Sequence, residues 1–377
     1  MKIEIKGVEF SNKGAELMLY SVIQMLDSHY DNYELVLKPG HLLPYQKRAK
    51  LGAWQKFAFN VFGLDWTWLG NWLPGPATRL LRHYGIVVEK DIDVVLDASG
   101  FVYSDKWGSR RLQDTVNQLK RITRHHHRYV FLPQAFGPFT TPKSTALMTQ
   151  AIKHARLVIS RDEDSYLSLK PLDGMNKVQC YPDFTVLLEV SEVELPPGLP
   201  EEYVCIIPNQ KMFGDKTSAS RERYLQFLSE AILAVQSLGL TAVLVNHEGK
   251  KDLKICTILI ERLPNKPMLL DGLDALAVKK VIGQSVFTLS SRFHGCVSGL
   301  SQGVPTLATS WSHKYGQLYG FYNSRGLLVG LDDSARLKDM MSDIISQRSQ
   351  LSEGLLILAD IHKQKTQQMW QVVFDKL

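Results

Sequence analysis

The stretch SSRFHG, residues 290–295, places a cation and an imidazole two residues apart directly after an apolar, strand-like run. Burying Arg292 costs free energy unless its guanidinium meets an anion, which either the protein or a ligand must supply. Arginine binds carboxylate and phosphate groups through paired hydrogen bonds. The imidazole of His294 titrates near neutral pH, so it can also donate a proton. This pair indicates an anion-binding or acid–base site.

Other candidate residues also follow strand-like runs. In an open parallel sheet, ligands bind beyond the carboxyl ends of the strands, where such side chains can gather. A set made of Arg161, Arg292, His294 and Lys314 would suit a ligand that carries both phosphate and carboxylate. Pairing of these cations with Asp or Glu side chains of the protein is the alternative. The remaining strand-end candidates are Asn12, Gly14, Asp97, Gln134, Asp183 and His247.

Several candidates also have a purely structural interpretation. Asp97 and Asp183 are equally well explained as helix caps. The run His125–His127 is typical of a solvated helix end, because three consecutive side chains of a helix cannot face one ion. His247 and Asp252 lack a further ligand at a recognisable spacing, so we expect no metal site.

Strand-like and helix-like segments alternate along the chain. This βαβ rhythm predicts parallel sheets covered by helices on both faces. The run ELPPGLP, residues 194–200, interrupts the alternation of strands and helices and is typical of a stiff, extended linker. We therefore expect an α/β protein with two doubly wound, Rossmann-like domains facing a cleft. The expected strands lie within 2–8, 33–39, 93–100, 129–137, 155–162, 203–210, 241–249, 267–273, 286–293 and 304–311.

The expected domain bounds follow from that linker. Residues 1–193 form the first domain and residues 201–334 form the second. Residues 335–377 are mostly helical and are expected to pack back on the first domain. Residues 54–84 depart from the rhythm, with four tryptophans among glycines and basic residues. Packing of this aromatic insertion on its parent domain is the favoured interpretation, and contact with a membrane interface is the alternative.

Composition restricts the class of protein and its partners. The chain has 377 residues, 45% of them hydrophobic and 22% charged, which is typical of a soluble globular protein with more than one domain. Its formal net charge of +6 suits an anionic small substrate or membrane surface but is too diffuse for nucleic acid. Four scattered cysteines suit reduced thiols in the cytoplasm. We expect no signal peptide and no transmembrane helix.

The order of these segments resembles the polysaccharide pyruvyl transferase family. SSRFHGCVSGLSQGVPTLATSWSHKYGQLY, residues 290–319, is similar to the family's S-x-R-x-H segment with its G-x-P strand and downstream lysine. This block is the most specific part. The stretches SNKGAELML, VISRDEDSYLSL, YPDFTVLL and VNHEGKKD resemble other family segments, and together the resemblance covers roughly residues 1–330.

The resemblance implies a fold like that of the GT-B glycosyltransferases. It also implies transfer of the pyruvyl group of phosphoenolpyruvate to two hydroxyls of one sugar, giving a cyclic ketal, in surface or exopolysaccharide biosynthesis. By matching positions, Arg161, Arg292 and His294 would be donor-site residues. The second domain would hold the donor and the first domain the acceptor. Glu16 departs from the family start, where an aspartate is common.

Such a reaction assigns roles to individual residues. Protonation of the donor's methylene carbon gives an oxocarbenium-like centre, which a sugar hydroxyl attacks. Phosphate then leaves and a second hydroxyl closes the ring, so preplaced cations stabilise the transition state. We expect Arg161 and Arg292 to hold phosphate and carboxylate, and His294 to donate the proton or bind phosphate. Asp97 or Asp183 would orient or deprotonate the sugar hydroxyl.

The partners expected are phosphoenolpyruvate, as donor co-substrate, and a saccharide acceptor for which a lipid-linked form is one option. The scheme needs no cofactor and no metal, and we expect no nucleic acid. The protein would be cytoplasmic, with peripheral contact at the cytoplasmic membrane face as an option. Lys314 would add charge to the donor site, and Asn12, Gly14, Gln134 and His247 would line the cleft.

Two alternatives come from other classes. In a GT-B-type glycosyltransferase, the same cations would hold the diphosphate of a nucleotide sugar. A non-catalytic anion-binding or scaffold protein of a polysaccharide assembly complex would bind a donor without turning it over.

Overall fold

The computed structural model describes residues 1–61, 64–124, 127–214, 217–309 and 314–377. The chain divides into two compact units. Unit 1 comprises Met1–Phe10, Met18–Phe184 and Lys365–Leu377, and unit 2 comprises Ser11–Leu17 and Thr185–Gln364. The early segment Ser11–Leu17 therefore belongs to the same unit as SSRFHG. The linker expected at 194–200 stays a prediction.

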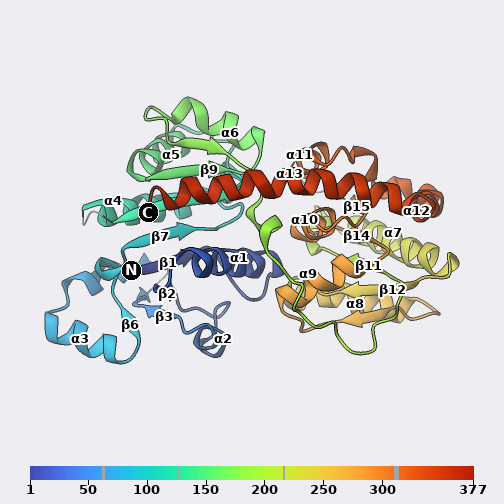
Figure 1. Cartoon of the computed structure of the whole chain (residues 1–377), viewed down its shortest axis with the longest axis horizontal. Coiled ribbons are helices and arrows are strands. Elements are labelled where there is room, and N and C mark those ends of the chain that lie inside the picture. Colours follow the sequence, from blue (N-terminus) through green and yellow to red (C-terminus); the bar gives the residue numbers. More distant parts are fainter. Residues whose placement is uncertain (62–63, 125–126, 215–216, 310–313) are drawn as a thin grey trace. The chain divides into compact units, whose positions relative to one another are not determined.

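Unit 1 is built on a parallel sheet with the strand order β10-β9-β8-β7-β1-β2-β3-β6 (Figure 1). All four residues of β7 are buried, because a parallel sheet is covered on both faces. A short antiparallel pair, β4 (Asn60–Val61) and β5 (Leu64–Asp65), stands apart from it. The strands are β1 (Lys2–Lys6), β2 (Glu34–Leu37), β3 (Trp54–Lys56), β6 (Ile86–Val87), β7 (Val94–Asp97), β8 (Arg128–Gln134), β9 (Leu157–Ser160) and β10 (Val178–Cys180).

Helices of unit 1 cover this sheet. Leu119 of α4 and Met148 of α5 belong to one buried cluster with Phe131 of β8. Helix α1 begins in the segment assigned to unit 2 and continues in unit 1. The helices are α1 (Lys13–His29), α2 (Tyr45–Lys50), α3 (Gly75–His83), α4 (Arg110–Arg124), α5 (Pro142–His154) and α6 (Glu163–Leu169), with 3-10 turns η1 (Thr67–Trp72), η2 (Glu89–Asp91), η3 (Asp105–Trp107) and η4 (Lys170–Leu172).

Unit 2 holds a second parallel sheet, with the order β13-β12-β11-β14-β15-β16. Numbered within the unit, this order is 3-2-1-4-5-6, that of the Rossmann fold. The chain reverses direction across the sheet between β11 and β14, and ligands bind outside the carboxyl ends of strands at such a switch point. The strands are β11 (Tyr203–Ile207), β12 (Thr241–Val245), β13 (Met268–Leu270), β14 (Phe287–Ser290), β15 (Thr306–Thr309) and β16 (Leu328–Val329).

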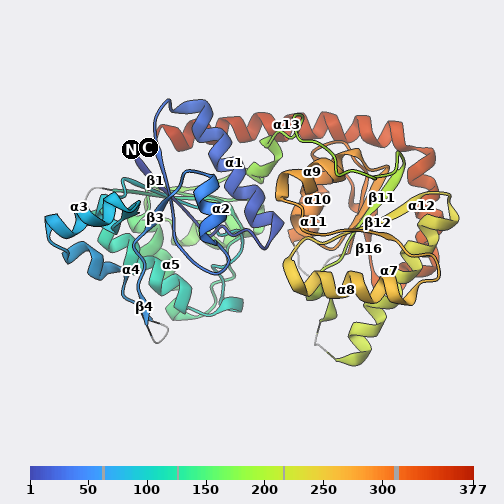
Figure 2. The same cartoon turned by 90° about the horizontal axis from the view of Figure 1, so that it is seen from below.

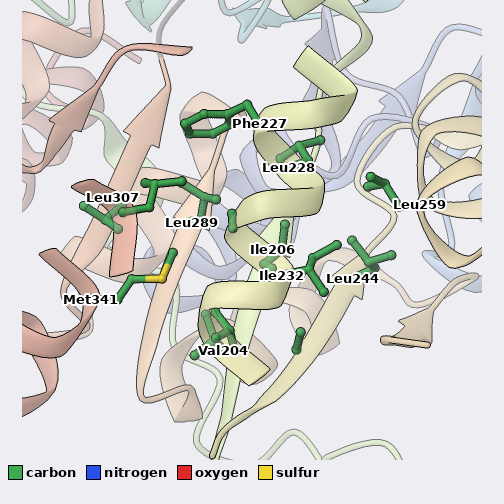
Figure 3. Packing of buried hydrophobic residues seen from close by; sticks show 14 of the residues in the cluster. Val204, Ile206, Phe227, Leu228, Ile232, Leu244, Leu259, Leu289, Leu307 and Met341 are labelled. Carbon is green, nitrogen blue, oxygen red and sulfur yellow. The ribbon is translucent and has the colours of Figure 1, made fainter. Parts of the chain in front are cut away.

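The core of unit 2 explains why its strands are almost wholly apolar. Val204 and Ile206 of β11 pack with Phe227 of α7 and Met341 of α12 on one face (Figure 3). The alternate residues of β11 pack on the other face with Ile282 of α9. Figure 2 shows α7 and α8 beside β11 and β12. Burial on both faces produces continuous apolar runs rather than alternation.

The helices of unit 2 include the C-terminal ones. Leu337 and Met341 of α12 are part of the unit 2 core, and Leu355 of α13 lies in a second buried cluster of that unit. Residues 335–364 fall in unit 2, where these side chains are buried, and Lys365–Leu377, which holds the end of α13, falls in unit 1. The packing of 335–377 on the first domain stays a prediction. The helices are α7 (Ser218–Ser237), α8 (Gly249–Arg262), α9 (Ala275–Gln284), α10 (Phe293–Leu300), α11 (Lys314–Phe321), α12 (Leu337–Ser346) and α13 (Arg348–Phe374), with turns η5 (Phe184–Leu187), η6 (Gln210–Phe213), η7 (Arg325–Leu327) and η8 (Leu331–Arg336).

The α/β class with two doubly wound, Rossmann-like units is confirmed. Within the described ranges, no helix has both the length and the apolar character needed to cross a bilayer.

Candidate active site

The switch point of unit 2 carries a turn that is held by a network of hydrogen bonds. Asn209, just after β11, donates from Nδ2 to the carbonyl oxygen of Ser291 over 2.9 Å. Tyr315 donates to the same oxygen, also over 2.9 Å, and the hydroxyls of Tyr224 and Ser291 lie 2.7 Å apart. These partners come from three different elements, so they hold the start of the turn formed by Ser291–His294, which we call the SRFH turn, firmly in place. The turn delivers Arg292 to the first position before α10.

The guanidinium of Arg292 contacts two carboxylates. One belongs to Asp252 in α8, and the other to Glu248, the residue just before that helix. Nε and Nη2 donate to the two oxygens of Asp252 over 2.9 and 2.6 Å, and Nη1 donates to Glu248. Burial lowers the pKa of Arg292, but the charges of Asp252 and Glu248 outweigh it and leave the pKa above its usual value. The protein therefore supplies the counter-charge that a buried cation needs.

The two carboxylates differ in how they are held. The side chain of Asp252 is 0% exposed, whereas that of Glu248 is 27% exposed. Asp252 also accepts the backbone N–H of Gln210 over 3.2 Å. Asp252 thus fixes the guanidinium plane, and Glu248 is the more exposed partner, at Nη1.

His247 lies at the end of β12 with a buried side chain. Neither of its ring nitrogens has a hydrogen-bond partner among the described residues. Burial holds the pKa of His247 well below its usual value, and the charges of Arg292, His294 and Lys13 lower it further. The imidazole is therefore neutral at pH 7 and offers one donor and one acceptor nitrogen. Leaving both unused costs free energy, so a ligand that bonds to them would bind favourably.

The first turn of α1 packs against the SRFH turn. Lys13 donates its N–H to the carbonyl oxygen of His247 over 3.0 Å, and Asn12 forms a bridge with Glu248. The N–H of Gly14 donates to Oδ1 of Asn12 over 3.0 Å. A Cβ atom on Gly14 would lie 2.2 Å from Nδ1 of His294, so only glycine fits there. Asn12 and Gly14 thus place the helix start on the imidazole.

Two lysines lie at the same edge of unit 2. Lys314, the first residue of α11, places Nζ 4.8 Å from the ring centroid of Phe293 and 5.8 Å from that of Tyr315, which is cation–π geometry. Lys13 pairs with Glu16 over 2.6 Å. Together with Arg292 and the carboxylates that pair with these cations, the two lysines form an edge that carries both charges. The sequence had suggested a purely cationic edge.

Unit 1 gathers the other predicted residues at the carboxyl ends of β7, β8 and β9. Arg161 pairs with Asp183 over 3.3 Å and donates its N–H to the carbonyl oxygen of Gln134 over 3.1 Å. Nε2 of Gln134 donates to the carbonyl oxygen of Asp97 over 3.1 Å. Oε1 of Gln134 is buried without a hydrogen-bond partner among the described residues. These four residues form one connected group.

Asp97 is fully engaged by its neighbours. One carboxylate oxygen accepts the N–H of Ser99 over 3.1 Å and its hydroxyl over 2.5 Å. The other accepts the hydroxyl of Tyr103 over 2.6 Å and that of Tyr129. A carboxylate has about four lone-pair positions, and all are used here. Gly7, with φ +82°, closes on Ser99 so tightly that a Cβ would come 2.4 Å from its Cα.

The structure thus sorts the predicted site residues into two groups, one in each unit. Unit 2 brings together Asn12, Gly14, His247, Arg292, His294 and Lys314, and unit 1 brings together Asp97, Gln134, Arg161 and Asp183. Sequence reasoning missed Glu248 and Lys13. It placed Asp252 at a strand end but weighed it there as a metal ligand and not as the partner of Arg292. The strand-end rule could have found Glu248, since it closely follows β12.

The described part of the chain contains no group of three or more His, Cys, Asp or Glu side chains arranged to hold a metal ion. His125 and His126 lie outside the described residues.

Solved structures with similar folds include UDP-GlcNAc 2-epimerases and a rhamnosyltransferase. The UDP-GlcNAc 2-epimerase of Neisseria meningitidis bound to UDP-GlcNAc matches with a TM-score of 0.58 and 12% identity, over 98% of this chain and 100% of that one. The Methanocaldococcus jannaschii UDP-GlcNAc 2-epimerase in complex with UDP-GlcNAc and UDP gives 0.54 and 11%, over 92% and 93%. Spinosyn rhamnosyltransferase SpnG gives 0.53 and 11%, over 97% of both chains. At such identities the likeness establishes the fold, which is of the GT-B type.

Sequence comparison is more specific about the family. No match was found among curated proteins. The sequence pattern of the family described as "Polysaccharide pyruvyl transferase" matches residues 12–313, which run from Asn12 at the start of α1 to the residue before Lys314. Because this match spans most of the sequence and every site residue of the two groups except Lys314, the chain belongs to the polysaccharide pyruvyl transferase family.

Proposed function

We propose that the protein transfers the pyruvyl group of phosphoenolpyruvate to two hydroxyls of one sugar, forming a cyclic ketal in surface or exopolysaccharide biosynthesis. The observation that carries this proposal is that buried Arg292 and His247 lie with half-buried His294 at the switch point of unit 2, in a chain of this family. Cations and a neutral imidazole together suit a small ligand with a phosphate and a carboxylate.

The donor would bind by exchanging one carboxylate for another anion. Asp252 keeps Arg292 oriented, and a phosphate or carboxylate oxygen of the donor replaces Glu248 at Nη1. Lys314 adds charge from α11, and His247 donates or accepts a hydrogen bond. Arg161 of unit 1 is the second arginine assigned to the donor.

The proposed reaction needs no reactant besides phosphoenolpyruvate and the sugar. A proton adds to the methylene carbon of the donor and makes a methyl group, while the adjacent carbon becomes an oxocarbenium-like centre. One sugar hydroxyl bonds to that carbon, and the second displaces phosphate. The two sugar hydroxyls each lose a proton. One proton restores the proton donor that protonated the methylene carbon, and the other leaves with the phosphate. His294 is the proposed proton donor, because His247 is held neutral.

The acceptor side is assigned to unit 1. Asp183 is the proposed group that orients or deprotonates the sugar hydroxyl. Asp97 is proposed to hold the loop after β7, because its four lone-pair positions are used. The acceptor is a saccharide, and a lipid-linked form would bring the protein to the cytoplasmic face of the membrane.

Phosphate release from phosphoenolpyruvate in the presence of candidate sugars tests the reaction. Arg292→Ala and His294→Ala should each abolish it in folded protein. Full turnover by both folded variants would show the donor-site assignment to be wrong.

The fold shared with spinosyn rhamnosyltransferase SpnG keeps a glycosyltransferase as the second candidate. There the same cations would hold a nucleoside diphosphate. Thermal-shift titration separates the two, because stabilisation by a ligand follows its affinity for the folded state. Stabilisation by phosphoenolpyruvate supports the first candidate, and stabilisation by UDP alone supports the second.

A further inference from the structure

Several large apolar side chains of unit 1 are exposed. They lie on η1 and Trp66 just before it, and on α3 and Tyr84 just after it. Trp72 is 80% exposed, Leu80 60% and Tyr84 72%. Trp66 and Leu69 are exposed as well. We call these five residues the η1–α3 surface. Figure 1 shows α3 beside β6, the edge strand of its sheet.

The backbone beneath this surface is firmly held. A Cβ on Gly70 would lie 2.6 Å from the ring of Phe57, so η1 packs closely on the neighbouring segment. Oδ1 of Asn71 accepts the N–H of Lys90 over 2.9 Å, and Nζ of Lys90 donates to the carbonyl oxygen of Asn71 over 3.0 Å. The exposed side chains of η1 are therefore presented by an anchored turn.

Packing on the parent domain explains only part of the aromatic segment 54–84. Trp54 lies in β3, within the sheet, and is half-buried like Trp68. Trp72 instead leaves most of its surface in contact with solvent. Exposed large apolar side chains that lie close together in the sequence, rather than scattered singly, favour an interaction surface.

Charge identifies the kind of partner. Residues 66–85 contain no aspartate or glutamate, and they contribute Arg79, Arg82 and His83. All three side chains are exposed on α3. Arg82 pairs with Asp91 over 2.9 Å, whereas the exposed Arg79 has no ion pair among the described residues. The η1–α3 surface is thus apolar, aromatic and cationic.

We propose that the η1–α3 surface binds the headgroup layer of a lipid bilayer that contains anionic lipids. Trp and Tyr favour the boundary between headgroups and acyl chains, and arginines near them are attracted to anionic headgroups. Leu69 and Leu80 would enter the outer acyl region beside them. The helix α3, residues Gly75–His83, would lie in the plane of the interface. This inference goes beyond the proposed function and does not depend on the donor chemistry.

Flotation of the full-length protein with vesicles tests the proposal. Vesicles of phosphatidylcholine alone are compared with vesicles that also contain phosphatidylglycerol. Trp72→Ser/Leu80→Ser should weaken binding to the anionic vesicles about tenfold or more, because the apolar contact is lost. Arg79→Gln should weaken binding to anionic vesicles and leave weak binding to neutral ones unchanged.

Leu167→Ser is the matched control, since Leu167 is 59% exposed on α6 of the same unit. It should bind vesicles like the wild type. Near-equal binding by wild type and Trp72→Ser/Leu80→Ser, or no vesicle binding at all, would overturn the proposal. So would a change of the double variant from an oligomer to a monomer with no change in vesicle binding, since the surface would then be a protein contact. Phosphate release with a water-soluble sugar is expected to be the same in all these variants, so failure of the reaction and failure of this surface are distinguishable.

Discussion

Gly14 lies directly against the imidazole of His294, so that a Cβ on Gly14 would come 2.2 Å from Nδ1 and 2.8 Å from Cγ. The contact joins the start of α1 to the first turn of α10 within unit 2. Glycine is needed here for close approach rather than for backbone conformation, because Gly14 has no positive φ. The segment SNKGAELML therefore belongs to the site that holds SSRFHG.

Replacing Gly14 by alanine should displace the imidazole of His294. A misplacement of about 1 Å can cost about a hundredfold in rate, so we expect a loss of that order in kcat/KM for Gly14→Ala. Gly354→Ala is the control, since Gly354 lies in α13 with nothing near a Cβ. It should keep full activity and gain about 0.5–1 kcal/mol of stability. Steady-state phosphate release and urea unfolding measure both; unchanged turnover in folded Gly14→Ala would contradict the role of this contact.

The sequence predicted the main strands well, because each is an apolar run that must be buried on both faces of a parallel sheet. Each range expected to hold a strand contains one. The strands β3, β4, β5, β6 and β16 were not predicted, because segments of two or three residues outside a longer apolar run show no periodicity. Their pairing is decided by neighbouring strands and not by local sequence.

The site was predictable as a set of residues but not as contacts. The strand-end rule found Arg292 and His294, yet it could not choose between a ligand and the protein as partner of the guanidinium. The pairing with Asp252 spans 40 positions in the chain and appears only once β12 and β14 flank β11 in one sheet. The packing of Gly14 on His294 likewise depends on which unit holds Ser11–Leu17.

The two carboxylates around Arg292 should respond differently to neutral replacement. Glu248→Gln removes the competing charge at Nη1 and should lower KM for phosphoenolpyruvate with little change in stability, since Glu248 is partly exposed. Asp252→Asn leaves a buried cation without its main partner and should lower the free energy of unfolding by about 3–5 kcal/mol. Initial-rate kinetics and urea unfolding measure these effects. A raised KM in Glu248→Gln would mean that Glu248 helps to hold the donor.

His247 should make stability depend on pH in a defined direction. Its pKa is well below the usual value in the folded state, so below about pH 6.5 the unfolded chain binds a proton there that the folded protein does not. Stability is therefore lost as pH falls from 6.5 towards 5, at up to about 1.4 kcal/mol per pH unit from this group. His247→Gln should show a shallower slope over that range in urea unfolding. Equal slopes would mean that His247 accepts a proton in the folded protein.

Asp97 should act on stability more than on turnover. In Asp97→Asn an amide group faces hydroxyl donors from Ser99, Tyr103 and Tyr129, so at least one buried donor loses its acceptor. Each lost partner costs about 1–3 kcal/mol, and we expect a lower melting temperature with kcat of the folded protein nearly unchanged. A stable Asp97→Asn variant without turnover would instead make Asp97 the group that activates the sugar.

Asp183 should show the opposite behaviour if it activates the sugar hydroxyl. Asp183→Asn keeps a hydrogen-bond acceptor for Nη1 of Arg161, which donates to this carboxylate over 3.3 Å. An amide cannot take a proton from the sugar, and general-base catalysis contributes about 10²–10⁴-fold to a rate. We therefore expect kcat to fall within that range while phosphoenolpyruvate still stabilises the variant in a thermal-shift titration. The sugar hydroxyl is not needed for binding of phosphoenolpyruvate. If Asp183→Asn lost both its turnover and its stabilisation by phosphoenolpyruvate, Asp183 would therefore serve the donor through Arg161.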